Sequence, residues 1–395
     1  MKPSTDAEKI KEVLERGVEE VIERESLQKK LFAGKPLRIK FGIDPTGADL
    51  HLGHAVPLRK LRAFQDLGHQ VILLIGDYTA LIGDPTGRSQ TRPILTPAEV
   101  KKNMKTYTDQ AALVLDMSKV EIRYNSEWYG ATEFTQLLME LTSKITVARI
   151  LERDDFQKRL KEGSDIQMQE LLYPLLQGYD SVALKADVEL GGTDQKFNLL
   201  MGRKLQKRYE QPEQDIMTVP LLEGTDGEKK MSKSYDNYIA LLDAPEEMFG
   251  KVMSIPDKCI IKYFELATDV PSTKIEAYKR ALIDGANPRD NKMMLGSALV
   301  KMYHSEAAAK KATEHFVNTF KNKERPADIP SVKPSTYDII TVLIEGKLVE
   351  TKSDARRAIE QGGVKIDDVK VESIEAKVNQ GSVVQKGKRF FVKVV

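Results

Sequence analysis

Strand-like and helix-like patterns of apolar residues alternate along the first half of the chain. Residues 38–43 (RIKFGI) and 70–75 (QVILLI) are short and largely apolar, as expected of strands buried inside a sheet. Residues 54–67 lie between them with a helical pattern that stops at Gly68. Because a strand, a helix and a second strand in succession form a βαβ unit, the chain is predicted to build a parallel sheet in an α/β fold.

Further elements of both kinds are predicted around this unit. Strands are expected at 120–124, 187–190 and 216–222, and an apolar helix at 165–179. Thr96 and Glu99 form a capping box that starts another helix. At the beginning of the chain, residues 4–33 predict one amphipathic helix that Ser4 or Thr5 can cap.

The pattern changes twice in the second half of the chain. Residues 245–322 are helical throughout, whereas residues 321–336 contain three prolines and are typical of a linker. The tail predicts two short helices followed by short strands. These changes divide the chain into a Rossmann-like parallel-sheet domain at 1–240, an α-helical domain at 241–322, a linker at 323–336 and a small α+β domain at 337–395.

Composition narrows the class of protein. A chain of 395 residues with 41% hydrophobic and 30% charged residues is typical of a globular protein with two or three domains. The net charge of +2 means that any nucleic-acid binding depends on local basic patches. One cysteine, Cys259, excludes an internal disulfide framework. The acidic start is unlike a targeting peptide and no apolar run has the length of a membrane span, so we expect a cytoplasmic protein.

The segment between the first two strands predicts an anion site. His51, Gly53 and His54 lie where the helix after the first strand begins. The first turn of a helix directs free N–H groups and the positive end of its dipole outward, which favours a phosphate. Gly53 lacks the side chain that would keep a flat ligand away from the backbone. Pro57 is most easily tolerated in a first turn, which places the helix start near His54.

Three further loops carry candidate polar residues. Arg88 and Arg92 lie in a Gly/Ser/Thr-rich loop after the second strand, and a solvated surface role remains open for both. Lys230 and Lys233 lie in a later loop, KMSKS, where lysine is otherwise commonly solvent-exposed. Asp194 follows two glycines, and it could simply cap the next helix.

One helix carries three polar residues on one face. Tyr173, Gln177 and Asp180 have the spacing i, i+4 and i+7, which aligns them along an otherwise apolar helix. A solvated face is the simpler interpretation of such a group. The apolar surroundings and the following strand favour a face directed into a site.

Taken together, these motifs resemble one family. HLGH at 51–54 followed by KMSKS at 230–234 is similar to the motif pair of class I aminoacyl-tRNA synthetases. GIDPTGADLHLGH, LIGDPTGR, the Tyr173/Gln177/Asp180 pattern and GGTDQ extend the likeness to the tyrosyl-tRNA synthetases over nearly the whole chain. The last sixty or so residues resemble an S4-type RNA-binding domain.

The resemblance implies a role for each candidate residue. The reaction would join tyrosine to ATP, with Mg²⁺ as part of the ATP complex, and then transfer the tyrosyl group to the 3′ end of tRNA(Tyr). Phosphate and pyrophosphate contacts would fall to His51, His54, Arg88, Arg92, Lys230 and Lys233, and the rest of ATP to Gly53, Asp194 and Gln195. Tyrosine would be bound by Gly42, Asp44, Asp84, Tyr173, Gln177 and Asp180, and RNA by Arg356, Arg357, Lys388 and Arg389. The resemblance implies a homodimer, no prosthetic group and no resident metal.

The chain departs from the family pattern at Lys40. Many bacterial members have a tyrosine there, which also contacts the phenol of the substrate. Together with KFN after GGTDQ, Lys40 indicates a bacterial subtype in which phenol recognition is shared differently. Asp180 is then expected to accept the phenol hydroxyl.

Two other interpretations compete with this one. Tryptophanyl-tRNA synthetases share the fold and the two class motifs, but the position of Asp180 and the S4-like tail favour tyrosine. A non-catalytic RNA-binding protein on a synthetase scaffold is the second alternative, and the intact pairs His51/His54 and Lys230/Lys233 argue against it.

Overall fold

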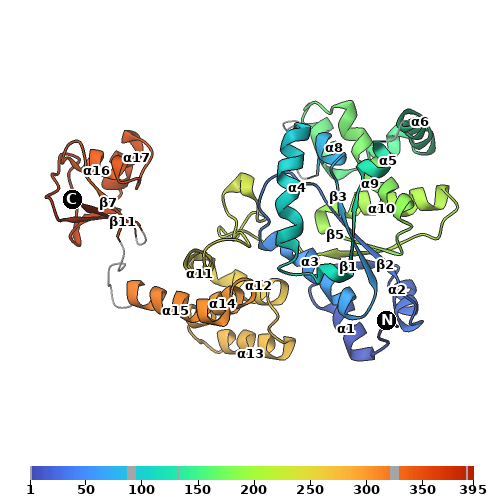
Figure 1. The fold of residues 1–395 in the computed structure, drawn as a ribbon, viewed down its shortest axis with the longest axis horizontal. Coiled ribbons are helices and arrows are strands. Elements are labelled where there is room, and N and C mark those ends of the chain that lie inside the picture. The colour runs from blue at the N-terminus through green and yellow to red at the C-terminus, as the bar shows by residue number, and fades with distance from the viewer. Residues whose placement is uncertain (1, 87–94, 131–132, 321–328, 388–389) are drawn as a thin grey trace. The chain divides into compact units, whose positions relative to one another are not determined.

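The chain forms two compact units in the structure, a computed structural model (Figure 1). The structure describes residues 2–86, 95–130, 133–320, 329–387 and 390–395. The first unit is Met1–Ala309 and the second is Lys310–Val395. In the described part of the chain, no helix has the length and apolar character needed to cross a membrane.

A six-stranded sheet lies at the centre of the first unit. Its order is β1-β6-β5-β2-β3-β4, with all neighbours parallel except the edge pair β1 and β6. Strand β3 is apolar and buried apart from Gln70, which explains why it was recognisable in the sequence, whereas β2 and β5 also bury Lys40 and Glu189. The strands are β1 (Glu20–Ile22), β2 (Arg38–Ile43), β3 (Gln70–Ile75), β4 (Val120–Tyr124), β5 (Val188–Gly192) and β6 (Asp215–Val219).

Helices cover both faces of this sheet. The connections from β2 to β3 and from β5 to β6 run in opposite directions from the centre, so right-handed crossovers put α3 and α10 on opposite faces. Helices α9 and α10 pack closely together. The helices of this part are α1 (Ala7–Glu15), α2 (Arg24–Phe32), α3 (Leu52–Asp66), α4 (Pro97–Ala111), α5 (Ser126–Tyr129), α6 (Phe134–Lys144), α7 (Val147–Ile150), α8 (Asp154–Lys161), α9 (Met168–Leu184) and α10 (Lys196–Arg208).

The predicted βαβ unit is present, with one adjustment. Strands β2 and β3 have the expected bounds, but α3 begins at Leu52 with His51 as its N-cap. Pro57 therefore lies in the second turn and not in the first. It lacks the N–H that would bond the carbonyl of Gly53 four residues earlier.

The prediction of a single helix over residues 4–33 was wrong. Helix α1 ends at Glu15, residues 20–22 form edge strand β1, and α2 follows. Gly17 has φ of +59°, a left-handed conformation that interrupts the helix. Asp6, and not Ser4 or Thr5, is the N-cap, because its side chain accepts the N–H of Lys9.

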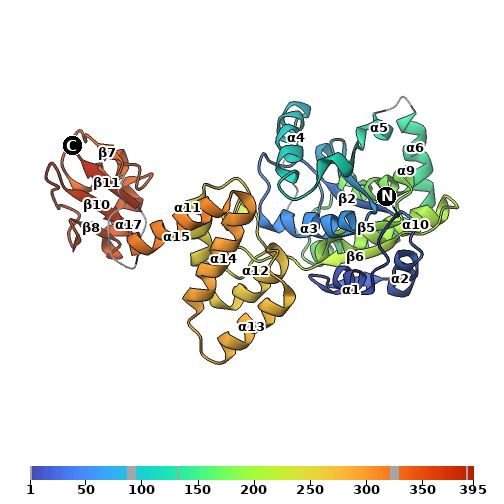
Figure 2. The same cartoon turned by 60° about the horizontal axis from the view of Figure 1, so that its bottom comes forward.

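Helices alone follow the sheet, as the pattern predicted. Helices α11 and α12 pack against α14, and α12 also packs against α13 and against α3 of the sheet region (Figure 2). These contacts join the helical region to the sheet region within the first unit. The helices are α11 (Pro245–Ser254), α12 (Ile260–Ala267), α13 (Ser272–Ile283), α14 (Pro288–Tyr303) and α15 (Glu306–Phe320).

The second unit is a small α+β fold with its own apolar core. Helices α16 (Ile339–Glu345) and α17 (Lys352–Glu360) pack on a sheet of order β7-β11-β10-β8-β9. The two helices and the last four strands match the predicted tail. Strand β7 falls inside the stretch assigned to a linker, because residues 331–332 pair in parallel with β11. The strands are β7 (Ser331–Val332), β8 (Val364–Ile366), β9 (Val369–Lys370), β10 (Val383–Lys386) and β11 (Phe390–Val394).

Candidate functional site

A cavity of about 940 Å³ opens at the carboxyl ends of the parallel strands. It lies between β2 and β5, where the direction of strand progression reverses, and this is where open α/β sheets bind ligands. Most of the residues predicted for the site line it: Gly42, Asp44, His51, Gly53, His54, Asp84, Tyr173, Gln177, Asp180, Asp194, Gln195, Lys230 and Lys233. Arg88 and Arg92 lie outside the described residues.

Two stacked histidines form one wall of the cavity at the start of α3. Their ring centroids are 3.8 Å apart, and the backbone N–H of His51 donates to Nδ1 of His54 at 3.3 Å. Burial lowers the pKa of both rings, and the pKa of His54 falls to about 3. Both imidazoles are therefore neutral near pH 7. With Nδ1 of His54 accepting, its Nε2 carries the proton and can donate to a ligand.

Glycine at position 53 leaves room for the His51 ring. A Cβ atom at this position would lie 3.0 Å from Cε1 and Nδ1 of His51 and 3.5 Å from Cβ of Met231. Because a contact of 3.0 Å is tight, a side chain here would shift the His51 ring by a few tenths of an ångström. Glycine here thus allows the imidazole to fold over the first turn of α3, a reason that the sequence did not reveal.

A basic loop, KMSKS at 230–234, also lines the cavity. Nζ of Lys230 lies 2.7 Å from Oδ2 of Asp194, which extends from the end of β5. Nζ of Lys233 lies close to the backbone of Gly47, where a Cβ atom would be only 2.8 Å away. Burial lowers the pKa of Lys233. Asn237 fixes the loop, since its Oδ1 accepts the N–H of Ser232 at 2.8 Å.

Asp44 is held at the end of β2 by two hydroxyl groups. Tyr173 Oη donates to its Oδ2 and Thr79 Oγ1 donates to its Oδ1, both at 2.8 Å. The side chain of Asn125 in turn donates to Thr79 Oγ1 at 2.9 Å. Tyr173 on α9 is thereby tied to a residue far away in the sequence.

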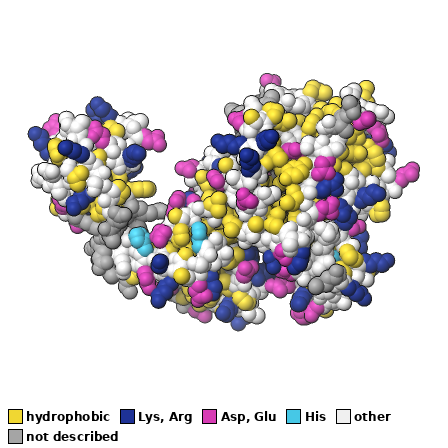
Figure 3. Space-filling view, viewed as in Figure 1, with side chains coloured by type: hydrophobic (Ala, Val, Ile, Leu, Met, Phe, Trp, Pro, Cys, Tyr) yellow, Lys and Arg dark blue, Asp and Glu magenta, His cyan; other side chains and the backbone are white. Residues whose placement is uncertain are grey.

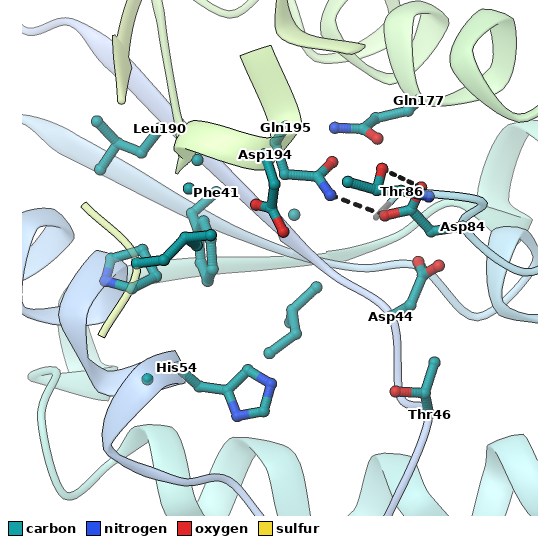
Figure 4. A pocket seen from close by; sticks show the side chains of 18 of the residues that line it. Phe41, Asp44, Thr46, His54, Asp84, Thr86, Gln177, Leu190, Asp194 and Gln195 are labelled. Carbon is teal, nitrogen blue, oxygen red and sulfur yellow. Dashed lines mark hydrogen bonds between the residues drawn. The ribbon is translucent and has the colours of Figure 1, made fainter. Parts of the chain in front are cut away.

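Asp84 is the second carboxylate at this end of the cavity. Its Oδ2 accepts from Gln195 Nε2 at 2.7 Å, and its Oδ1 accepts the N–H of Thr86 at 2.9 Å (Figure 4). Burial alone would raise the pKa of Asp84, but the charge of Arg153 and the hydrogen bonds from Thr86 and Gln195 outweigh it and lower the pKa. Asp84 is therefore an anion at neutral pH and suits a cationic group.

Asp180 lies at the closed end of the cavity. Its Oδ1 accepts from the indole Nε1 of Trp128 at 3.0 Å, and Asn125 Nδ2 lies 3.5 Å from its Oδ2. Burial raises its pKa to about 7, and the charge of Lys40 and the neighbouring hydrogen bonds partly oppose this rise. Trp128 belongs to the four-residue helix α5, and Asn125 precedes it. Neither was predicted from the sequence, because so short a helix has no recognisable pattern.

Lys40 forms a buried ion pair below Asp180. Its Nζ lies 2.8 Å from Glu189 Oε1, 2.9 Å from Ser181 Oγ and 3.2 Å from the carbonyl oxygen of Gln177. Three partners use all three N–H groups of the ammonium. The sequence marked Lys40 as unusual but gave no sign of its partner Glu189.

Helix α4 holds the loop between β2 and α3. Gln110 bonds both the N–H of Leu50, at 2.6 Å, and the carbonyl oxygen of Ala48, at 2.8 Å. Asn103 donates to the carbonyl oxygen of Pro45 at 2.9 Å. These polar residues within a helix resemble ordinary surface positions, so the sequence could not identify them.

The four predicted RNA-binding residues belong to the second unit. Arg356 and Arg357 are exposed on α17, and Arg357 pairs with Asp354 at 2.8 Å. Lys388 and Arg389 lie outside the described residues. Within the described ranges, no group of three or more His, Cys, Asp or Glu side chains is arranged to hold a metal ion.

Two family models together match almost the whole chain. The model of the class I tRNA synthetases (W and Y) matches residues 33–321, and that of the tyrosine–tRNA ligase SYY-like C-terminal domain matches residues 322–393. The first model alone spans more than half of the chain. The second matches the unit that the tail pattern predicted.

Curated relatives agree with both models. A tyrosine–tRNA ligase of Thermotoga maritima is 52% identical over 394 residues, which are 99% of this chain and 98% of the relative. A tyrosine–tRNA ligase of Burkholderia lata is 53% identical over 392 residues, covering 97% of this chain and 94% of the relative. The likeness therefore includes both units.

Solved structures show the same fold at lower identity. A C-terminally truncated mitochondrial tyrosyl-tRNA synthetase from Aspergillus nidulans has a TM-score of 0.66 at 22% identity, covering 79% of this chain and 94% of that one. A tyrosyl-tRNA synthetase from Archaeoglobus fulgidus, solved with L-tyrosine, has a TM-score of 0.63 at 23% identity, covering 78% and 99%. These neighbours confirm the predicted α/β fold with a parallel sheet.

Proposed function

The chain belongs to the tyrosyl-tRNA synthetases, the class I tyrosine–tRNA ligases, and we propose that it activates tyrosine in the cavity between β2 and β5. The carboxylate of tyrosine attacks the α-phosphorus of ATP. The bond to the bridging oxygen breaks, and tyrosyl-adenylate and pyrophosphate form. The tyrosyl group then passes to a ribose hydroxyl at the 3′ end of tRNA(Tyr).

ATP binds across the start of α3 and the basic loop. His54 donates its Nε2 proton to phosphate as a neutral group, and His51 supports it. Lys230 and Lys233 neutralise the pyrophosphate as it leaves, so catalysis consists of positioning and charge stabilisation. Asp194 accepts from the ribose, and Gln195 lies beside the acyl-phosphate linkage. Mg²⁺ enters with the phosphates of ATP.

Arg88 and Arg92 complete the phosphate contacts in this proposal. Their loop follows Asp84 and Thr86, which lie in the cavity wall. Two guanidinium groups would add positive charge to that of Lys230 and Lys233. Gly53 allows the adenosine to approach the first turn of α3.

Tyrosine binds with its ammonium at one end and its phenol at the other. Asp84, Tyr173 and Gln177 surround the ammonium, with Asp44 and Gly42 at the end of β2. The phenol hydroxyl donates to Asp180 at the closed end. Because Lys40 has no N–H left over, it does not donate to the phenol.

The buried carboxyl of Asp180 carries the choice of tyrosine over phenylalanine. A buried acceptor that loses its partner costs free energy, so phenylalanine is rejected at this point. Tryptophan, the substrate of the alternative family, carries an indole N–H that can also donate to a carboxylate, so this acceptor separates tyrosine from phenylalanine and not from tryptophan. The tyrosyl relatives at about half identity and the matched C-terminal domain favour tyrosine over tryptophan.

ATP–pyrophosphate exchange measured with each amino acid in turn tests this function. We expect exchange with tyrosine only, and its collapse in Asp180→Ala. Exchange with tryptophan would support the alternative synthetase. No exchange with any amino acid, together with retained tRNA binding, would support a non-catalytic RNA-binding protein.

Transfer RNA binds outside the cavity in this proposal. The helical region at 241–322 and the second unit at 337–395 serve as tRNA-binding parts, with Arg356, Arg357, Lys388 and Arg389 contacting phosphate. Charge reversal at Arg356 and Arg357 should weaken tRNA binding without changing ATP–pyrophosphate exchange.

A homodimer in the cytoplasm completes the proposal. Apolar side chains lie exposed on α6 to α9, and Figure 3 shows hydrophobic atoms gathered over this region. Such a patch is typical of an interface. The exposed residues are Met139, Val147, Leu160 and Met168, with exposed fractions of 69%, 62%, 51% and 74%. Charged substitutions there should give monomers in sedimentation velocity.

A further inference from the structure

Arg153 is a buried charged residue behind the cavity. It precedes α8 as its N-cap and is only 4% exposed, and it does not itself line the cavity. One of its terminal nitrogens, Nη2, lies 3.6 Å from Oδ1 of Asp84 and donates to Oγ1 of Thr86. The other, Nη1, donates to Oδ1 of Asn198 at 3.2 Å. Arg153 thus contacts two residues that line the cavity, Asp84 and Thr86, and a third, Asn198, that bonds to two more.

The guanidinium sets the direction of a chain of hydrogen bonds. Because arginine can only donate, the Asn198 amide must turn its oxygen to Arg153 and its nitrogen away. That nitrogen donates to Oε1 of Gln177 at 2.8 Å and to Oε1 of Gln195 at 3.1 Å. Gln195 then has its Nε2 free to donate to Asp84 at 2.7 Å.

The same arrangement presents acceptors to the cavity. Figure 4 shows Gln195 pointing to Asp84, with Gln177 nearby. Each amide oxygen has a second lone pair besides the one that Asn198 occupies, and Asp84 keeps its negative charge. A cation at this point would find acceptors in the amide oxygens of Gln177 and Gln195 and in the carboxylate of Asp84.

Asp155 keeps Arg153 from cancelling that negative charge. Its Oδ1 lies 2.8 Å from Nε of Arg153. Arg153 and Asp155 together carry no net charge, so the negative charge of Asp84 is left uncompensated by this pair. Arg153 can therefore hold Asp84 in place without neutralising the group.

We propose that Arg153 is a positioning residue for the ammonium group of the amino-acid substrate, acting through Asp84 and Asn198. This inference rests on the proposed function, because it needs tyrosine in the cavity. The segment before α8 therefore contributes to substrate binding although it does not line the cavity.

A pair of substrate fragments separates this role from a general structural one. Tyramine keeps the ammonium and lacks the carboxylate, whereas 3-(4-hydroxyphenyl)propionate keeps the carboxylate and lacks the ammonium. Both are measured as competitive inhibitors of tyrosine in ATP–pyrophosphate exchange. Neither KM nor Ki depends on how much of the protein is folded, so partial misfolding of a variant does not disguise the result.

Arg153→Met should weaken only the ligands that carry an ammonium. We expect the KM for tyrosine and the Ki for tyramine to rise by about tenfold or more, as for the loss of a hydrogen bond to a charged group. The Ki for 3-(4-hydroxyphenyl)propionate and the KM for ATP should stay the same. Arg153→Lys keeps the charge but not the planar fork, so it should give a smaller rise.

Arg149→Met is the matched control. Arg149 lies four residues earlier, in α7, is partly exposed and pairs with Glu152, and it does not line the cavity, so all four constants should match the wild type. Equal weakening of both fragments in Arg153→Met, or no change in either, would overturn the inference while wild-type tyrosine exchange still supported the function. Failure of the wild type to activate tyrosine would instead overturn the proposed function.

Discussion

Lys40 and Glu189 form an ion pair of 2.8 Å near Asp180, with both side chains at most 2% exposed. Lys40 belongs to β2 and Glu189 to β5, so the pair bridges the two strands between which the cavity opens. Ser181 and Gln214 also donate to Glu189, Ser181 at 2.9 Å. Lys40 is therefore part of the scaffold that joins these two strands.

Breaking this pair should destabilise the protein. Lys40→Met leaves the Glu189 charge buried without its cation, and such a loss costs about 3–5 kcal/mol. In urea unfolding we expect that decrease for Lys40→Met, and a clearly smaller one when Glu189→Leu is added, since the double variant has no buried charge. Strictly additive losses in this double-mutant cycle would mean that the two residues do not interact.

The pH dependence of tyrosine activation should follow Asp180. Its pKa is raised to about 7 by burial, so the carboxyl is protonated below that pH and accepts the phenol proton only above it. We therefore expect kcat/KM for tyrosine to rise through an apparent pKa near 7. The pKa values of His51 and His54 are lowered far below this range, so neither histidine can produce the step.

Two variants assign that step. Asp180→Asn should abolish it together with most of the activity, and Lys40→Met should move it to higher pH, because the Lys40 charge lowers the pKa of Asp180. A step in kcat/KM that persists unchanged in Asp180→Asn would belong to another group.

The raised pKa of Asp180 also affects the stability of the protein. Because the folded state binds this proton more tightly than the unfolded state, the carboxyl adds most to the free energy of unfolding below about pH 4, and this contribution is lost as the pH rises through 7.

Much of the fold was predictable because its signals are local. The strands at 38–43, 70–75 and 120–124 have the expected bounds. Strand β3 at 70–75 is the clearest case, because a buried parallel strand is a short apolar run, whereas no residue of β4 is fully buried. Residues 4–33 failed because periodicity continued across Gly17, whose left-handed conformation only tertiary structure requires. The edge strand β1 is stabilised by pairing with β6, a contact that residues 20–22 do not encode alone.

The residues that line the cavity were predictable from sequence motifs. The buried residues that hold them in place were not. His51, Lys230 and Asp180 were found from loops and helix faces. Lys40 with Glu189, and Arg153 with Asp84, are pairs between residues more than sixty positions apart. Each partner looks like an ordinary charged residue by itself, and only folding brings the two together.

Because Lys230 and Asp194 form an ion pair, substitutions of the two residues should have non-additive effects on ATP–pyrophosphate exchange. Both have ATP contacts in the proposed function, so their 2.7 Å bond must open when the nucleotide enters. Lys230→Met should lower kcat of exchange by roughly a hundredfold, as for the loss of one preorganised group at a developing charge. Asp194→Asn should chiefly raise the KM for ATP.

Double substitution and a neighbouring lysine test this coupling. The double variant should lose less than the sum of the two single variants, because each single change also frees the other residue. Lys229 is exposed beside Lys230, so Lys229→Met should retain wild-type kinetics. Equal effects of Lys229→Met and Lys230→Met would attribute the loss to the charge of the loop in general.

Gly47 should control the position of Lys233. A Cβ atom at Gly47 would lie 2.8 Å from Nζ of Lys233, too close for contact, so Gly47→Ala must displace the ammonium. We expect kcat of exchange to fall by about tenfold, while the KM for tyrosine stays the same, because a misplaced charge stabilises the leaving pyrophosphate less well.

The Lys233→Met background isolates this cause. Without the ammonium there is nothing at Nζ for the new methyl group to displace, so Gly47→Ala should then have no further effect on kcat. An equal loss in both backgrounds would show instead that alanine disturbs the loop between β2 and α3. In that case Thr106, which donates to the carbonyl oxygen of Ala48, is the anchor to test next, by Thr106→Val.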